Sequence, residues 1–269
     1  PIQQSRPPAV AGLFYPQQGA ELRDQVETLI AAARKPDDAE LSRPKVLIAP
    51  HAGYVYSGAV AGSAYARITA CRGRVDRVVL LGPAHRVRVR GLATPTAEAF
   101  STPLGEVPLD RRAIATIAEL PQAGVSDLAH AQEHSLEVHL PFLQQALGEF
   151  RLVPLVVGDA SGEAVAEVLE LLWGGDETLI VISSDLSHYL PYPRACAVDE
   201  FTAETILRLR PQLNHEQACG ATPINGLLLA AHSHQLRPQL IDLRNSGDTA
   251  GDKSRVVGYA AFAFYEPTH

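Results

Sequence analysis

The sequence contains no methionine, one tryptophan and three cysteines in 269 residues. Cys71, Cys196 and Cys219 are odd in number and far apart, so they do not form a disulfide framework and they indicate a reducing compartment. No apolar stretch approaches the ~20 residues of a membrane-spanning helix. Residues 1–8 are polar and proline-rich and lack the apolar segment of a signal peptide. We therefore expect a cytoplasmic protein without a membrane span.

Positive charge is also scarce. The chain has 23 Lys and Arg against 30 Asp and Glu, a net charge of −7, which argues against nucleic acid as a partner. The 20 glycines and 20 prolines nowhere gather into a linker, and a short charged connector at 35–44 is the weakest stretch. Apolar residues make up 46% and charged residues 20%, as in ordinary globular proteins. We predict a single domain over residues 1–269.

Short apolar runs alternate with amphipathic segments along the chain. The runs predict buried strands at 45–49, 77–81, 152–157, 178–182, 236–243 and 255–264. Helical spacing predicts helices at 21–34, 57–68, 109–119, 135–147, 162–172, 195–209 and 224–231. Pro154 indicates an edge or irregular position for its strand. The alternation predicts an α/β sandwich with helices on both faces of the sheet.

Histidine and carboxylate side chains follow three of the predicted strands. These residues are His51, His85, Asp185 and His188. Open α/β sheets bind ligands outside the carboxyl ends of their strands, so we expect these side chains to share one site. Imidazoles with a carboxylate or thiolate suit iron, zinc or copper. Two histidines and one anionic ligand form the facial arrangement that Fe²⁺ uses for O₂ chemistry.

Cys219 lies just before the predicted helix 224–231, and Pro223 at the start of that helix resembles a first helical position. The positive end of a helix dipole favours a thiolate, so Cys219 is a candidate metal ligand or nucleophile. The alternative is a small buried side chain. Cys71 and Cys196 are assigned to structure.

Titratable groups are dense between residues 133 and 139. His134 and Glu137 are three residues apart and can share a helix face. The spacing is not the His-Glu-x-x-His pattern of zinc proteases. Glu133 and His134 either reach into the site from its rim or cap a surface helix, and both interpretations remain open. His139 is given no role.

Several of these segments follow one another in the order of a known family. They are 9–16 (AVAGLFYP), 49–58 (APHAGYVYSG), 81–85 (LGPAH), 102–105 (TPLG), 133–137 (EHSLE), 183–188 (SSDLSH) and 247–254 (GDTAGDKS). The chain resembles the Memo-like proteins, also called AmmeMemoRadiSam system protein B. That family is similar in fold to the catalytic subunits of class III extradiol dioxygenases, which are non-haem Fe²⁺ enzymes. The resemblance implies an αβα sandwich around a mixed, largely parallel sheet, with a metal pocket.

The resemblance also implies roles for individual residues. His51, His85 and Cys219 match the metal positions of the family, and His188 matches the acid/base histidine of the dioxygenases, with Asp185 beside it. Iron (Fe²⁺) is the expected metal, and copper and zinc are the alternatives. The dioxygenases have a carboxylate where this chain has Cys219. Because a thiolate is soft and oxidisable, we expect little catechol cleavage.

Four functions therefore compete, one of which is a metallohydrolase. The first is a metal-dependent redox enzyme of extradiol type that takes a small-molecule or peptide ligand in its metal cleft. The second is a catalytically vestigial metal-binding or adaptor protein. The third, implied by the family name, is a partner of a radical-SAM protein in a modification system. The candidate catalytic residues are His188, Asp185, Glu133 and His134.

Overall fold

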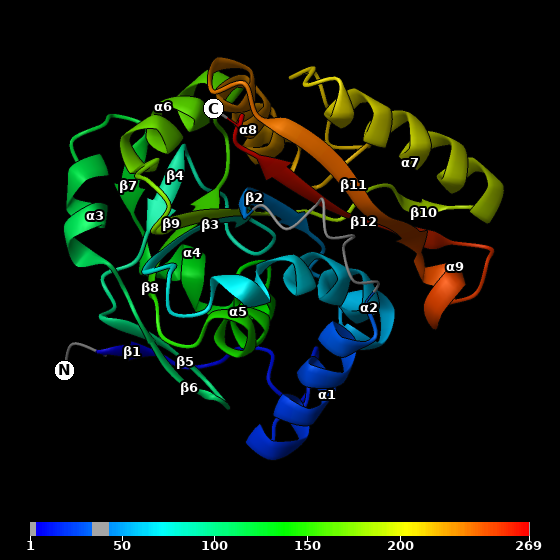
Figure 1. Cartoon of the computed structure of the whole chain (residues 1–269), viewed down its shortest axis with the longest axis horizontal. Coiled ribbons are helices and arrows are strands. Elements are labelled where there is room, and N and C mark those ends of the chain that lie inside the picture. The colour runs from blue at the N-terminus through cyan, green and yellow to red at the C-terminus, as the bar shows by residue number, and fades with distance from the viewer. Residues whose placement is uncertain (1–3, 34–42, 269) are drawn as a thin grey trace.

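A mixed β-sheet forms the middle layer of the computed structural model, which describes residues 4–33 and 43–268 (Figure 1). In order across the sheet, the strands are β10 (His188–Leu190), β12 (Val256–Tyr265), β2 (Pro44–Ala49), β9 (Thr178–Ser183), β3 (Arg77–Pro83), β8 (Arg151–Val157), β4 (Leu92–Thr94) and β7 (Ala123–Val125), with β11 (Arg237–Asn245) paired to β12 off this path. The four strands β2, β9, β3 and β8 run parallel at the centre, and antiparallel partners flank them. The predicted α/β class is confirmed.

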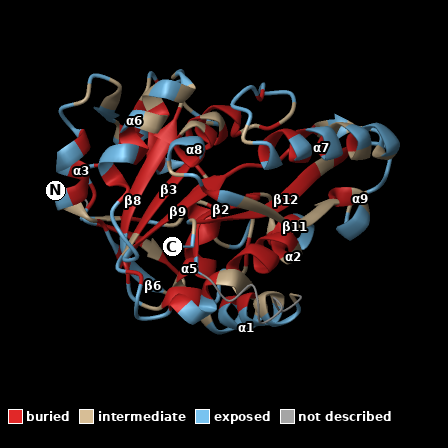
Figure 2. Cartoon of the chain, turned by 45° about the horizontal axis from the view of Figure 1, so that its top comes forward, coloured by how far each residue is buried: buried red, intermediate tan, exposed pale blue. Residues whose placement is uncertain are grey.

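Helices cover both faces of this sheet (Figures 1 and 2). One face carries α1 (Gly19–Ala31), α2 (Tyr54–Tyr65) and α5 (Leu140–Leu147), which contact one another. The other carries α3 (Arg111–Ile117), α6 (Gly162–Leu172), α7 (Tyr192–Leu207) and α8 (Ala221–Ser233). Every residue of β2 and β9 is buried, which explains why these strands are continuously apolar rather than alternating.

Shorter elements join these layers. They are the helical segments η2 (Ala66–Cys71), α4 (Asp127–Ala131), η3 (Glu137–His139) and α9 (Ser246–Thr249), and a small sheet of β1 (Ser5–Arg6), β5 (Ala99–Thr102) and β6 (Gly105–Pro108). The sequence pattern did not predict the small sheet, because its strands are too short to show a period. Across the described ranges, no helix is both long enough and apolar enough to cross a membrane.

One boundary of the sequence prediction is wrong. The expected helix from residue 135 begins only at Glu137 as η3, and α5 starts at Leu140, because the preceding residues turn toward the sheet edge. Pro154 lies where β8 has a ladder partner only on its β3 side, as expected for an edge or irregular position, although β8 as a whole lies between β3 and β4. The ladder with β4 covers only Val156 and Val157, so the N–H that proline lacks is not needed there. The predicted connector at 35–44 lies largely outside the described residues.

Candidate metal centre

The carboxyl ends of β2, β9 and β3 meet at one edge of the sheet, because these strands are parallel neighbours. His51, Asp185 and His85 each stand two residues beyond the strand that delivers them. Ala49 pairs with Ser183 in the β2–β9 ladder, so His51 and Asp185 follow strand ends that lie side by side. The structure therefore brings these three side chains to one edge of the sheet.

Three imidazoles converge at this edge. One ligand nitrogen from each of His51, His85 and His134 lies within 4.8 Å of the other two. The ring centroids of His51 and His85 are 5.0 Å apart, and the ring of His134 stacks on that of His85 at 4.6 Å. His134 comes from the loop between α4 and η3, so of its two predicted places it takes the one inside the site. We call these three residues the imidazole cluster.

The outer nitrogens of two of these rings are already engaged. The Nδ1 atom of His51 lies 2.7 Å from Ser183 Oγ, and that of His85 lies 3.0 Å from a Glu133 carboxylate oxygen. Glu133 also accepts the backbone N–H of His85. The Nδ1 atom of His134 is buried and makes no hydrogen bond to any residue that the structure describes, and a Glu133 carboxylate oxygen lies 3.5 Å from it. Three imidazole nitrogens this close together, with Glu133 orienting the ring of His85, form a donor set that fits a metal ion.

Electrostatics favour neutral rings for His51 and His134. Burial, and then the proximity of His85 and His134, lowers the pKa of His51 well below its usual value. Burial and His85 likewise lower the pKa of His134. Burial opposes ionisation of Glu133, yet its hydrogen bonds with His85 lower its pKa to about 2. Metal ligands must be deprotonated, so neutral imidazoles beside an ionised carboxylate are ready to bind an ion.

Cys219 lies against the cluster rather than inside it. Its Sγ atom is 3.4 Å from His51 Nε2 and accepts the backbone N–H of Asp185 at 3.3 Å. The expected thiolate is wrong for the metal-free protein, because burial and the nearby Asp185 raise the pKa of Cys219 to about 12. Desolvation therefore outweighs the dipole of α8, which begins after the N-cap Gly220. A bound metal ion would reverse this preference by deprotonating the thiol.

Asp185 is buried, and its carboxylate faces the same loop. One carboxylate oxygen accepts the backbone N–H of His51 at 2.8 Å, and the other lies 3.7 Å from His51 Nε2. Burial raises the pKa of Asp185. These contacts hold the His51 backbone in place, and they come from a residue that the sequence placed in the site as a candidate catalytic group.

A cleft of about 1000 Å³ opens beside the cluster. His85, His188 and Cys219 line it, so the structure brings together three of the residues that the sequence assigned to the site. The remaining lining residues come from α7, its neighbouring strand and the loop before α8; they are Leu190, Arg194, Ala197, Val198, Phe201, Asn214, His215, Glu216 and Gln217. The lining thus combines apolar, polar and charged groups.

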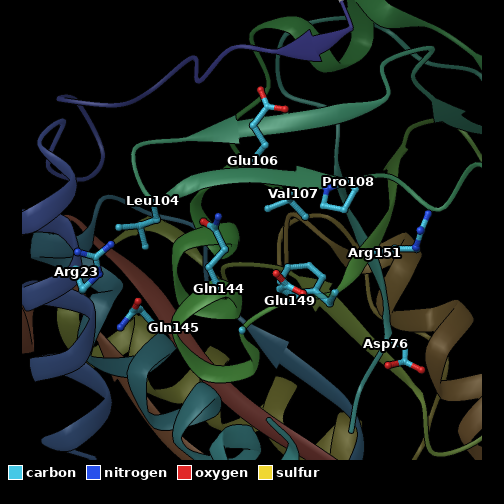
Figure 3. A pocket seen from close by; sticks show the side chains of 12 residues that line it. Arg23, Asp76, Leu104, Glu106, Val107, Pro108, Gln144, Gln145, Glu149 and Arg151 are labelled. Atoms are coloured by element: carbon cyan, nitrogen blue, oxygen red, sulfur yellow. The ribbon is translucent and has the colours of Figure 1, made fainter. Parts of the chain in front are cut away.

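A second cavity, of about 740 Å³, lies at the opposite ends of the strands (Figure 3). Asp76 and Arg151 mark the amino ends of β3 and β8, Gln144 and Gln145 come from α5, and Val107 comes from β6. The described residues that line it include no histidine or cysteine, in contrast to the cleft beside the imidazole cluster.

Sequence reasoning missed the residues behind His51. Ser183 and His139 are both buried, and Ser183 Oγ lies 2.8 Å from His139 Nε2 as well as 2.7 Å from His51 Nδ1. The Ser-Ser-Asp run at the end of β9 was the available signal, but only its aspartate was singled out. All three cysteines are free, as expected.

Comparison with known proteins gives one consistent result. A family model described as "Memo-like protein" matches residues 6–263. A "MEMO1 family protein" from Aquifex aeolicus is 37% identical over 275 residues, which cover 96% of this chain and 98% of the relative. A MEMO1 family protein from Methanopyrus kandleri is 37% identical over 284 residues, which cover 96% of this chain and 98% of the relative. A crystal structure of an uncharacterized protein from Escherichia coli K12 has a similar fold, with a TM-score of 0.53 at 16% identity over 81% of this chain and 99% of that chain.

Proposed function

This chain belongs to the Memo-like protein family, and on that premise we propose that it binds one transition-metal ion at the carboxyl edge of its sheet. The observation that carries the proposal is the convergence of His51, His85 and His134 within 4.8 Å. Imidazole suits iron, copper and zinc. We propose Fe²⁺ before copper or zinc, because a wide cleft beside the cluster leaves room for further ligands on the ion.

Two residues compete to be the third ligand beside His51 and His85. His134 already has a ligand nitrogen within 4.8 Å of theirs. Cys219 has its sulfur 3.4 Å from His51 Nε2 and matches the metal position that the family resemblance implies. A thiolate ligand would favour copper and zinc more strongly than an imidazole would.

The surrounding side chains divide the remaining tasks. A bound ion would supply a Lewis acid and, for iron or copper, a redox centre. Glu133 orients the ring of His85, and Asp185 holds the backbone of His51. His188 lines the same cleft as His85 and Cys219, and in this proposal it moves a proton to or from a ligand bound there. We propose a dioxygenase-like oxidoreductase acting on a small molecule or peptide.

The second candidate function is a metal-binding or adaptor protein without turnover, including a partner of a radical-SAM protein. The engagement of the Glu133 carboxylate supports it. Both oxygens of Glu133 accept hydrogen bonds from His85 or Ser135, so Glu133 is not free to replace the carboxylate ligand of the dioxygenases. We therefore expect slow catechol cleavage or none.

Anaerobic titration with Fe²⁺ tests metal binding. We expect about one equivalent to bind the wild type and at least ~100-fold weaker binding to His85→Ala, since removing a ligand should exceed the 10–100-fold effect of its outer partners. His215→Ala is the control, because His215 lines the same cleft outside the cluster. Equal affinities of His85→Ala and the wild type would refute the proposal.

Spectroscopy of the Co²⁺-loaded protein identifies the third ligand. A near-ultraviolet sulfur-to-metal band that is present in the wild type and disappears in Cys219→Ser would identify Cys219 as the third ligand. A wild type without this band, together with weak metal binding to His134→Ala, would identify His134 instead. Oxygen consumption by the Fe²⁺-loaded protein with catechols then separates the two functions. His188→Ala should keep its metal affinity and lose any turnover; loss of metal binding would make His188 a ligand.

A further inference from the structure

Ser183 lies behind the imidazole cluster with three polar contacts on one hydroxyl. Its Oγ atom is 2.6 Å from the carbonyl oxygen of Ser135, 2.7 Å from His51 Nδ1 and 2.8 Å from His139 Nε2. The Ser183 side chain is fully buried and His139 is nearly so, so bulk water does not supply hydrogen-bond partners to these groups. The directions of these hydrogen bonds can therefore be assigned from the contacts themselves.

A serine hydroxyl has one hydrogen and two lone pairs. The carbonyl of Ser135 can only accept, so the hydrogen of Ser183 points to it. Both imidazole nitrogens at Ser183 must then carry the hydrogen and donate. His51 is thus protonated at Nδ1 and His139 at Nε2.

Tyr65 closes the network on the far side. Its hydroxyl lies 2.7 Å from His139 Nδ1. A neutral imidazole carries a single N–H, and that of His139 is already at Nε2, so Tyr65 donates to Nδ1. Each polar hydrogen in the hydrogen-bond network from Tyr65 through His139 to Ser183 then has one acceptor.

We propose that Ser183 is a positioning residue that fixes the tautomer of His51, so that the lone pair of Nε2 faces the metal centre. The reverse tautomer would place the bare Nδ1 2.7 Å from an oxygen whose hydrogen is committed to Ser135. It would also direct an N–H toward Cys219 and remove the lone pair that a metal needs. The role in metal binding rests on the proposed function, whereas the tautomer does not.

Nitrogen-15 NMR of the metal-free, histidine-labelled protein tests the tautomer directly. In the wild type, His51 should show a protonated Nδ1 and an unprotonated Nε2 in long-range ¹H–¹⁵N spectra. Ser183→Ala should give a mixture of tautomers or the reverse one, and Ser183→Thr, which keeps the hydroxyl, should restore the wild-type pattern. Ser57→Ala is the matched control, because it deletes an equally buried hydroxyl that donates to the Ala52 carbonyl.

Metal affinity provides the second readout. We expect Zn²⁺ to bind Ser183→Ala about 10–100-fold more weakly than the wild type, and Ser57→Ala to bind it normally. A wild-type His51 protonated at Nε2 would overturn the proposal, as would an unchanged tautomer in Ser183→Ala. The expected tautomer in a wild type that binds no metal would refute the proposed function and leave the tautomer assignment standing.

Discussion

Two polar clusters draw on the same stretch of chain, residues 133–139, and differ in how completely their atoms are paired. The carboxylate of Glu137 accepts four hydrogen bonds, from the Arg6 guanidinium, the Tyr15 hydroxyl and the backbone N–H groups of Ala9 and Val10. In the imidazole cluster, by contrast, His134 Nδ1 makes no hydrogen bond to a described residue, has only Glu133 at 3.5 Å, and three similar rings face one another. The comparison contrasts a carboxylate whose hydrogen bonding is complete, as in a structural cluster, with imidazole nitrogens that keep the capacity to bind a ligand.

The cluster around Glu137 also helps to position the imidazole cluster. Arg6 donates to the carbonyls of His130 and Glu133, at 2.7 Å and 2.8 Å. It therefore anchors the loop that carries Glu133, whose carboxylate holds the ring of His85. Arg6 in β1 thus holds Glu133 in position, although the two residues are far apart in the sequence.

The largest expected effect is on stability. Glu137→Gln removes the charge that pairs with Arg6 and should lower the free energy of unfolding by about 3–5 kcal/mol, because an uncompensated guanidinium stays buried. Urea denaturation measures it. Arg208→Met breaks an exposed pair with Glu204 and should cost less than about 1 kcal/mol. If both variants lose the same stability, the Glu137 cluster is not the anchor described above.

A smaller effect separates orientation from stability. Glu133→Gln keeps the shape of the side chain but weakens its hold on His85, so metal affinity should fall about 10–100-fold. Competition with a chromophoric chelator measures the change. Glu149→Gln makes the same substitution in the second cavity (Figure 3) and should bind metal normally. An unaltered affinity in Glu133→Gln would remove this residue from the site.

The smallest effect is in the response to acid. Burial lowers the pKa of His139 to about 3. Burial is also the largest cause that lowers the pKa of His130, to about 4. Below the unfolded-state pKa of about 6.5, the unfolded chain binds protons that the folded chain excludes, so the free energy of unfolding falls as the pH drops from about 6.5 toward 4. His139→Gln can donate to Ser183 and accept from Tyr65 without titrating. Urea denaturation across this range should show that the free energy of unfolding of His139→Gln falls less steeply than that of the wild type, by roughly 1 kcal/mol per pH unit. The same slope in both proteins would contradict the lowered pKa of His139.

The sequence predicted the parts of the site that depend on local pattern. Buried strands ending in His51, His85 and Asp185 were visible as apolar runs, and parallel pairing brought their ends to one edge. The position of His134 depends on how its loop folds against β3, which no local period encodes.

The network behind His51 was not predictable for a related reason. Its contacts join residues that are 44 to 132 positions apart, and a serine after a strand has no distinctive signature. The thiolate prediction for Cys219 failed because a sequence shows a helix start but not the burial that opposes it.

Metal content tests the central claim most directly. The untagged wild type and the His51→Ala/His85→Ala double variant should be purified side by side and analysed by inductively coupled plasma mass spectrometry. The account predicts about one transition-metal ion per wild-type chain, iron above copper and zinc, and almost none in the folded double variant. Equal metal content in the two proteins would contradict a metal centre at the imidazole cluster.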